Sequence, residues 1–509
     1  MLGGLFGVVS KHNLARDLFF GVDYHSHLGT EIGGIAFLNN DIEVISHDIS
    51  NSQFKSEFQK DYAKIKGKLG IGVISDTEED QPIKFESKIG TFALCTIGFI
   101  KNMEELHSEL IEDKASFKKS KVRDNKSILN QTEIVGELIT RGRNVIEGIE
   151  KMHEKIDGSI SLLLLSEDDR SIYASGDAFP LIVGKRGEDW AIASETSSFP
   201  NLGFEIFKFL EYREITSITE SGIRTRVNGP YQKRFCPFLH IYFGFPTSDY
   251  YGVNAEIVRE RCGGFLAEND DVMVDLVLGI ADSGFPHSVG YVKRKIELAK
   301  EKITSTLEQF NKKKISADEF ERNVTKALDS IAPLRRPLVK YTAGWGRSYI
   351  PPTQEKRELI AKYKQVPNPQ IIKDMRIILV DDSIRRGTQL RDLLREKIWP
   401  FQPKEVHGRI ASPPQMFPCI FDISTKNQDL ATRKAIIDIE GRDPKSVDEY
   451  IDPNSSKHKR MIEKIREMIG FTTLKYQTLE DMIKAIIEAA PDKFSLKKED
   501  LCLYCWMGK

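Results

Sequence analysis

The pattern of apolar and polar positions changes once along the chain, near residue 230, and so predicts two differently built halves. In the first half, short apolar runs bounded by Gly, Asp or Lys are typical of β-strands. Four such runs are predicted as strands, at 33–38, 69–74, 90–100 and 160–166. Helical spacing predicts two helices, at 134–141 and 145–156, and the polar stretch 114–130 is predicted to be an exposed loop.

From about residue 234 the pattern becomes strand followed by helix, which is typical of a parallel sheet with crossover helices. Continuous β-branched runs at 272–280 and 376–380 are predicted to be central strands of that sheet. The segment 293–328 is helical and highly charged, so we expect a solvated hairpin or an oligomer contact. The polar stretch 426–497 is expected to be a helical tail.

Length and charge narrow the class of protein. A chain of 509 residues is too long for one core and predicts two large domains. The formal net charge of −1 gives no reason to expect nucleic-acid binding. No apolar run approaches the roughly 20 residues that span a bilayer, so we expect a soluble, cytoplasmic protein with no membrane segment.

One stretch carries the strongest chemical signal: an apolar strand runs into Asp381 and Asp382 and then into a turn of small residues. In that turn Gly387 lets backbone N–H groups approach a phosphate, and Ser383 and Thr388 add hydroxyl donors. The two carboxylates would repel a phosphate, so they suit ribose hydroxyls or Mg²⁺ instead. The alternative is that the acidic pair only caps the helix that follows.

This stretch resembles the loop with which phosphoribosyltransferases bind 5-phosphoribosyl-1-pyrophosphate (PRPP), in the version found in the glutamine amidophosphoribosyltransferases. Three more segments resemble motifs of that family in the same order: a pyrophosphate loop at 281–291, a loop that closes over PRPP at 346–357, and a strand and turn at 406–414. The resemblance covers nearly all of residues 235–425. The residues that it implies for PRPP binding are Asp282, Ser283, Gly284, Arg347, Gln354, Asp381, Asp382, Ser383, Arg386, Gly387 and Thr388.

The same resemblance implies an α/β type I phosphoribosyltransferase domain over residues 234–425, with Mg²⁺ held by Ser283, Asp381 and Asp382. Before the closing loop the chain is longer than the resemblance implies. The extra length places an inserted helical hairpin at about 293–338.

Two of the six cysteines, Cys502 and Cys505, form a Cys-x-x-Cys pair, which favours metal or redox chemistry, with incidental thiols as the alternative. Part of the family carries a [4Fe–4S] cluster, and the resemblance implies that Cys236, Cys419, Cys502 and Cys505 hold one here. Structural zinc would accept the same four thiolates. The implied role is to fix the helical C-terminal segment, 426–509, to the transferase domain.

Residues 1–233 resemble the glutaminase domain of the family, an α+β N-terminal-nucleophile hydrolase with four αββα layers. Family members with this activity begin Met-Cys, and the exposed thiol attacks glutamine. Here Gly3 aligns with that cysteine, and no Cys, Ser or Thr precedes Ser10. We therefore expect a degenerate domain without a nucleophile.

Other positions of the expected glutamine pocket differ in the same direction. By resemblance, Ser75 stands where the family has the Arg that holds the substrate carboxylate, and Gln131 where an Asp meets the substrate ammonium. The segment 96–99, Thr-Ile-Gly-Phe, stands where the family has His-Asn-Gly-Asn with its oxyanion Asn. Loss of a nucleophile costs on the order of 10⁶ in rate, and loss of an oxyanion donor a further ~10² to 10³. Glutaminase activity is therefore expected to be absent.

These resemblances predict a purine-biosynthesis enzyme that forms 5-phosphoribosylamine and pyrophosphate from PRPP and free ammonia or another amine, with an ammonia-supplying protein as a possible partner. A homo-oligomer, dimer or tetramer, is expected. The alternative is a catalytically inactive homologue that binds PRPP or nucleotides and regulates an intact enzyme. A further alternative is a different ligand in the altered N-terminal pocket, lined by Asp76, Gln131 and Glu133.

Overall fold

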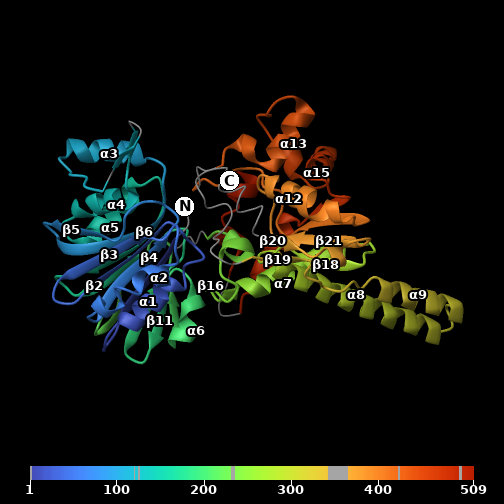
Figure 1. Ribbon diagram of the computed structural model, residues 1–509, viewed down its shortest axis with the longest axis horizontal. Helices are drawn as coiled ribbons and strands as arrows, with labels where there is room; N and C mark the ends of the chain where they lie inside the picture. Colours follow the sequence, from blue (N-terminus) through green and yellow to red (C-terminus); the bar gives the residue numbers. More distant parts are fainter. Residues whose placement is uncertain are drawn as a thin grey trace.

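The computed structural model describes residues 3–119, 121–123, 126–230, 235–341, 365–421, 425–491 and 496–508. Figure 1 shows two bodies side by side, with a two-helix projection from the second. The described residues up to 230 form the first body, and the second begins at residue 235. Within these ranges, every helix is too short or too polar to cross a membrane.

Two antiparallel sheets form the centre of the first body. One has the strand order β13 (Glu205–Phe209), β11 (Ile182–Arg186), β12 (Asp189–Ala193), β1 (Gly3–Val9), β4 (Leu69–Ser75), β2 (Ile32–Leu38) and β3 (Ile42–Asp48). The other has the order β15 (Gly222–Val227), β14 (Ile215–Thr219), β10 (Ser171–Ser175), β9 (Gly158–Ser166), β6 (Gly90–Ile100) and β5 (Ile83–Ser87). The four strands predicted from the sequence are confirmed as β2, β4, β6 and β9.

Helices cover the outer face of each sheet (Figure 1). On the sheet that contains β1 lie α1 (Ala15–Asp23), α2 (Phe54–Phe58) and α6 (Phe199–Leu202), and on the other lie α3 (Met103–Glu112), α4 (Gln131–Thr140) and α5 (Val145–Lys155). Alternate residues of β1 divide between two cores: Leu5 and Val9 pack between the sheets, and Phe6 and Val8 pack beneath α1. The predicted αββα layering and both predicted helices, α4 and α5, are thereby confirmed.

A parallel sheet organises the second body, in the order β18 (Leu276–Gly279), β21 (Arg376–Asp381), β22 (Glu405–Ile410) and β23 (Thr473–Tyr476). Helices lie on both faces, so its strands are apolar on both sides. Val277 and Ile378 face α7 (Ala255–Glu268) and α8 (Phe285–Asn311), whereas Leu276 and Ile377 face α13 (Ala431–Glu440) and α15 (Ser456–Ile469). The remaining helices are α9 (Ala317–Asp329), α11 (Pro369–Ile372), α12 (Thr388–Leu393), α14 (Asp448–Ile451), α16 (Leu479–Ile487) and α17 (Tyr504–Met507).

Three sequence predictions differ from this fold. The strand predicted over 272–280 is confirmed only as β18, because the residues before it are committed to polar contacts; Asp275 accepts a hydrogen bond from the Arg376 backbone at 2.7 Å. The segment predicted as a helical tail also contains β23, which extends the sheet beside β22. The predicted loop 114–130 contains a small hairpin, β7 (Lys121–Arg123) and β8 (Lys126–Ile128).

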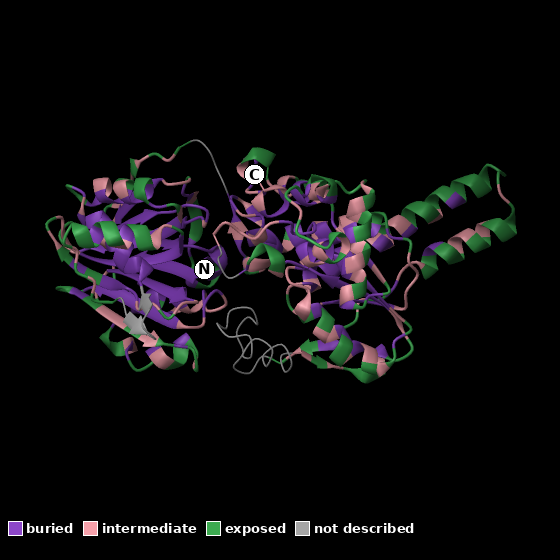
Figure 2. Cartoon of the chain, turned by 90° about the horizontal axis from the view of Figure 1, so that it is seen from above, coloured by how far each residue is buried: buried purple, intermediate pink, exposed green. Residues whose placement is uncertain are grey.

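The charged segment is confirmed as a helical hairpin, formed by α8 and α9. Figure 2 shows it projecting from the second body with mostly exposed and intermediate residues. Near its tip the rings of Phe310 and Phe320 pack with centroids 4.9 Å apart. Because α8 is 27 residues long and starts at the sheet, it joins the hairpin directly to the carboxyl edge of β18.

Candidate functional site

The carboxyl edge of the parallel sheet gathers the residues predicted to bind PRPP. Strands β18 and β21 are neighbours, so the segment 281–284 emerges beside Asp381 and Asp382. Close packing requires a glycine at position 284, because a Cβ there would lie 2.3 Å from the Val380 carbonyl oxygen. The two loops that the sequence assigned to one substrate therefore meet at one edge.

The acidic pair is buried: Asp381 is 8% exposed and Asp382 is 4% exposed. Burial raises the pKa of both carboxyls, and the charge of Asp382 raises the pKa of Asp381 further. The Ser383 hydroxyl donates to Asp382 at 2.6 Å, and Ser283 also hydrogen-bonds this carboxyl. Two adjacent buried carboxyls that are costly to ionise suit a divalent cation, whose charge would stabilise both.

The predicted phosphate turn lies directly after this pair. Gly387 has φ 76°, in the left-handed region that glycine adopts most readily, and α12 begins at Thr388. The Arg386 guanidinium donates to the Thr425 hydroxyl at 3.1 Å. No side chain caps the start of α12 among the described residues, so its first N–H groups face the turn as anion-binding groups do.

Asp282 of the predicted pyrophosphate loop is exposed, and its carboxylate pairs with Lys340 at 2.7 Å. Lys340 ends β19 (Leu338–Lys340), which pairs with β20 (Gln365–Pro367). The sequence prediction did not include Lys340, because nothing in its sequence context distinguishes it from other surface lysines. Arg347 and Gln354, predicted to close over PRPP, lie outside the described residues.

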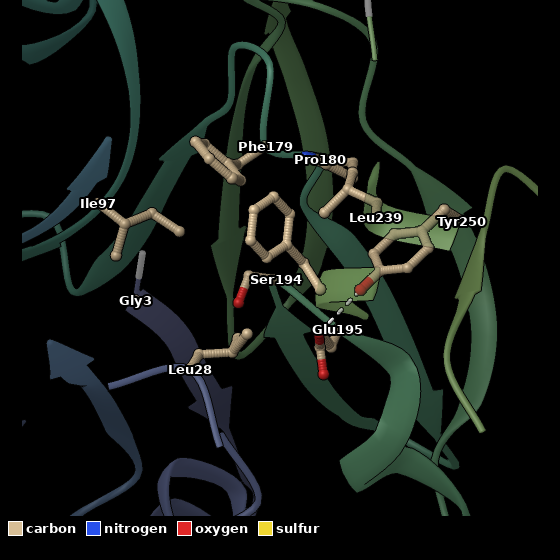
Figure 3. A pocket seen from close by; sticks show the side chains of 10 residues that line it. Gly3, Leu28, Ile97, Phe179, Pro180, Ser194, Glu195, Leu239 and Tyr250 are labelled. Carbon is tan, nitrogen blue, oxygen red and sulfur yellow. Dashed lines mark hydrogen bonds between the residues drawn. The ribbon is translucent and has the colours of Figure 1, made fainter. Parts of the chain in front are cut away.

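In the first body, the position of the expected nucleophile is closed. Figure 3 shows Gly3 beneath apolar side chains, and the remaining cavity is about 10 Å³, close to the minimum for one water molecule. The apolar side chains around it are Leu28, Ile97, Phe179, Leu239 and Phe243. A Cβ on Gly3 would lie 2.8 Å from both the Ile74 oxygen and the Ile97 Cγ2. No side chain fits at position 3 without displacement of its neighbours.

Asp76, Gln131 and Glu133, named as the possible lining of a changed pocket, are not among the described residues around this cavity. Glu133 instead accepts backbone N–H groups of Lys118 and Lys119. The Gln131 backbone N–H donates to the Glu79 carboxylate at 2.9 Å, and burial raises the pKa of Glu79 to about 7.

Glu195 is a site residue that the sequence prediction missed. It follows β12, is 2% exposed, and its carboxylate lies 2.8 Å from His27 Nε2. It also accepts a hydrogen bond from the Tyr250 hydroxyl at 2.8 Å, drawn in Figure 3, although Tyr250 belongs to the second body. An acidic residue two positions after the apolar run 190–193 was the available signal.

Backbone hydrogen bonds bring the predicted cysteine ligands together from three segments. The Cys502 N–H donates to the Phe235 oxygen at 2.9 Å, which places Cys502 beside Cys236. The N–H groups of Met416 and Phe417 donate to the Cys505 oxygen at 2.9 and 3.0 Å, which places the chain before Cys419 beside Cys505.

The four thiols interact with one another. Burial raises the pKa of Cys236, and Cys419 and Cys502 raise it further. A hydrogen bond with Cys419 raises the pKa of Cys505, and burial adds to this. None of the six cysteines, all of which are described, forms a disulfide. Metal cations would reverse this penalty by stabilising thiolates.

As the side chains stand, the described residues contain no group of three or more His, Cys, Asp or Glu side chains in an arrangement that could hold a metal ion. The number and chemistry of the thiols fit an iron–sulfur or zinc site, and the acidic pair fits magnesium. Neither metal is assigned by this geometry alone.

Known proteins match this chain both within its first half and over its full length. A glutamine amidotransferase domain model matches residues 68–201. The amidophosphoribosyltransferase of Methanothermobacter thermautotrophicus is 27% identical, over 99% of this chain and 93% of its own. That of Bacillus subtilis is 25% identical, over 99% of this chain and 93% of its own.

A solved structure has a similar fold. The B. subtilis glutamine PRPP amidotransferase, complexed with ADP and GMP, matches with a TM-score of 0.74 and 24% identity, over 99% of this chain and 96% of its own. The fold is therefore that of an N-terminal-nucleophile hydrolase domain joined to a type I phosphoribosyltransferase domain. Over almost their full length, these two amidophosphoribosyltransferases are similar to this chain.

Proposed function

We propose that this chain is a PRPP-dependent amidophosphoribosyltransferase that takes nitrogen from free ammonia or another small amine and not from glutamine. The observation that carries this proposal is the closed space at Gly3, where a Cβ would lie 2.8 Å from two neighbouring atoms. The acidic pair at the edge of the parallel sheet is present in the same chain. The glutaminase half has therefore lost its chemistry, whereas the transferase half has kept its binding groups.

Glutamine hydrolysis is lost because the pocket at Gly3 lacks room for a nucleophile and a substrate, as well as because the nucleophilic residue is missing. A nucleophilic side chain at position 3 would meet Ile97, which occupies the room that a substrate amide would need. A cavity of about 10 Å³ cannot hold a glutamine side chain. Loss of the nucleophile alone costs on the order of 10⁶ in rate.

In the proposed reaction the bond between ribose C1 and the pyrophosphate oxygen breaks, and pyrophosphate leaves with the electron pair. The nitrogen lone pair of ammonia forms the new bond to C1, and one proton passes from nitrogen to water. The products are 5-phosphoribosylamine and pyrophosphate. Positive charge develops on the ribose during this exchange, so water must be kept from C1.

The residues at the sheet edge would divide the work. Ser383, Arg386 and Thr388 would hold the 5-phosphate with hydroxyl, guanidinium and backbone donors. Asp381 and Asp382 would bind the ribose hydroxyls and, with Ser283, the metal. Bound Mg²⁺ would supply positive charge against the pyrophosphate.

Pyrophosphate would lie at the segment 281–284. Asp282 pairs with Lys340 in the described structure, and this lysine could offer its charge to the pyrophosphate. Arg347 and Gln354 would close over the substrate and exclude water.

We further propose that Cys236, Cys419, Cys502 and Cys505 hold a [4Fe–4S] cluster, with zinc as the other metal that fits four thiolates. Its role would be structural, because the proposed reaction transfers no electrons. The support is the convergence of three chain segments at the cysteines, fixed by backbone hydrogen bonds. Metal analysis of protein purified without oxygen separates iron and sulfide from zinc.

One assay tests the transferase proposal. Purified protein, kept free of oxygen, is incubated with PRPP, Mg²⁺ and either ammonium or glutamine, and pyrophosphate release is measured. We expect release that depends on ammonium and rises with pH as free ammonia increases, and no release with glutamine. PRPP binding without turnover under either condition would instead identify a non-catalytic regulator.

A matched variant tests the glutaminase half. A chain that begins Met-Cys in place of residues 1–3 restores the residue type but not the space, so we expect no glutamine-dependent release. Its ammonium-dependent rate serves as the control for folding. Glutamine-dependent turnover in this variant would show that the pocket is functional and that only the nucleophile was missing.

A further inference from the structure

Glu195 is the one charged residue among the described residues that line the closed pocket, and it lies at the boundary between the two bodies. The Glu195 carboxylate accepts the Tyr250 hydroxyl at 2.8 Å, the Phe245 N–H at 3.3 Å and the Ser248 hydroxyl at 3.4 Å. These three donors belong to the second body, whereas His27, 2.8 Å away, belongs to the first. The next residue, Thr196, also accepts a hydrogen bond across the boundary, from the Asp249 N–H at 2.8 Å.

Separating the two bodies at this contact would cost electrostatic free energy. Burial alone would raise the pKa of Glu195, but the charge of His27 and the hydrogen bonds hold it at about 2. The carboxylate is therefore ionised, and the hydrogen bonds that it accepts from Tyr250, Phe245 and Ser248 come from the other body. If the bodies separated, Glu195 would lose those donors, and a buried charge without partners is strongly destabilising.

The segment whose groups donate hydrogen bonds to Glu195 is itself held in place by one arginine. We define residues 239–250 as the junction segment. Arg259, in α7 and 3% exposed, donates to the His240 oxygen and to the Gly244 oxygen, each at 2.7 Å. Two backbone carbonyls held by one guanidinium leave the junction segment little freedom to shift.

The junction segment also contacts the start of α8. The His287 Nε2 lies within hydrogen-bond distance of the Ile241 oxygen, at 3.3 Å, and His287 is the third residue of α8, just after the segment 281–284. In that segment Ser283 hydrogen-bonds the Asp382 carboxyl. A displacement of the junction segment would therefore pass through His287 to the segment that contacts the acidic pair.

We infer that Glu195 and Arg259 are positioning residues for the transferase reaction: through Tyr250 and the junction segment, the degenerate N-terminal domain holds the acidic pair in its substrate-binding arrangement. This inference rests on the proposed transferase function. It gives the N-terminal domain a present role that needs no glutamine. It also explains why a buried ionised carboxylate persists beside a pocket that is filled with apolar side chains.

Two mild variants test the inference. Tyr250→Phe removes the hydroxyl but keeps the ring, and Glu195→Gln keeps the shape but removes the charge. Loss of a hydrogen bond to a charged group costs about 1.5–3 kcal/mol. If about half of that free energy is lost from PRPP binding at the acidic pair, we expect KM for PRPP to rise roughly threefold to tenfold. We expect kcat to change less than about twofold and the Mg²⁺ concentration needed for activity to increase.

Glu214→Gln is the matched control. Glu214 is also 2% exposed, but its partners Lys208, Thr216 and Glu211 all belong to the first body. We expect this variant to lose stability without a change in KM for PRPP. Equal KM values in wild type, Tyr250→Phe and Glu195→Gln would overturn the inference, as would an equal KM rise in Glu214→Gln.

Arg259 gives an independent comparison. Arg259→Lys keeps the positive charge but can donate to only one of the two carbonyls, whereas Arg259→Met removes the charge and both hydrogen bonds. We expect Arg259→Lys to recover part of the KM effect of Arg259→Met at similar thermal stability, and no recovery would contradict the role in positioning. If the wild-type protein itself shows no PRPP-dependent turnover, the proposed function fails first. The inference fails alone if wild type is active and the variants match it.

Discussion

At the scale of single residues, the N-terminal domain is closely packed at the position where the sequence resemblance expects a nucleophile. Ile97 lies against Gly3, and the surrounding space is about 10 Å³. An apolar lining avoids polar groups that would be buried without partners. Under the proposed loss of glutaminase chemistry, the domain can therefore keep a stable core.

Glu79 supports a pH prediction at this scale. Burial raises its pKa to about 7 in the folded chain, whereas an unfolded glutamate ionises near 4.5. Because the folded pKa is the higher one, Glu79 lowers stability progressively as pH rises from about 4.5 to 7. We expect Glu79→Gln to raise the free energy of unfolding by on the order of 2 kcal/mol at pH 8.

The difference between wild type and Glu79→Gln should vanish at pH 4, which chemical denaturation at both pH values would measure. Glu86→Gln, at an exposed position of β5, is the control for the substitution itself. A stabilisation that is equal at both pH values would show that the ionisation of Glu79 is not its cause.

Some site residues were predictable from sequence and others were not. The acidic pair and the predicted phosphate turn are local in sequence, so a strand followed by Asp381, Asp382 and Gly387 was enough to propose them. Glu195 was missed because its partners His27 and Tyr250 are distant in sequence, and Tyr250 belongs to the other body. Lys340 was missed because only the fold brings it to Asp282.

At the scale of elements, α7 and α8 form the closest helix contact near the site. A Cβ on Gly263 would lie 1.8 Å from the His287 oxygen, and one on Gly290 would lie 1.8 Å from the Glu260 oxygen. The two backbones therefore touch at each of these glycines. Because α8 begins directly after the predicted pyrophosphate loop, this contact helps to position that segment.

Adjacent glycines in α7 provide a sharp prediction. Gly263→Ala should destabilise the protein by about 3 kcal/mol or more, because its Cβ meets backbone that cannot move away. Gly264→Ala should stabilise it by about 0.5–1 kcal/mol, since its Cβ would make ordinary contacts with the Arg294 Cβ at 3.8 Å and the Gly290 oxygen at 4.0 Å. Thermal or chemical denaturation of the two variants measures the difference, and equal effects would contradict close helix packing.

Element prediction succeeded where the apolar period was long and failed where polar and apolar signals mixed. The eleven-residue strand β6 was predicted with its observed bounds. Strand β23 was missed because its sequence, Thr-Leu-Lys-Tyr, has only four residues and lies between two helices. Its pairing with β22 is a long-range contact that no local pattern records.

At the scale of the whole molecule, the C-terminal segment returns to the beginning of the second body. Leu501 forms a parallel bridge with Phe235, and Trp506 donates to the Pro413 oxygen at 3.1 Å. The proposed cluster would fix this return, so it should stabilise the whole second body and not only the last residues.

We expect Cys502→Ser to lose the bound metal and to destabilise the protein by more than the roughly 1 kcal/mol typical of a point substitution. Cys262→Ala is the control, because Cys262 is buried in α7 outside the four thiols. It should lose some stability and retain its metal. Metal content and unfolding temperature are measured on the same samples, and full metal retention in Cys502→Ser would exclude this cysteine as a ligand.

The continuity of α8 has a mechanical consequence. A helix of 27 residues is about 40 Å long and behaves as a stiff rod. The backbone contact at Gly290 divides it into a short arm that ends at the predicted pyrophosphate loop and a long arm that ends at the projecting tip. A sideways force on the tip would therefore act on the segment 281–284 with a larger force and a smaller displacement.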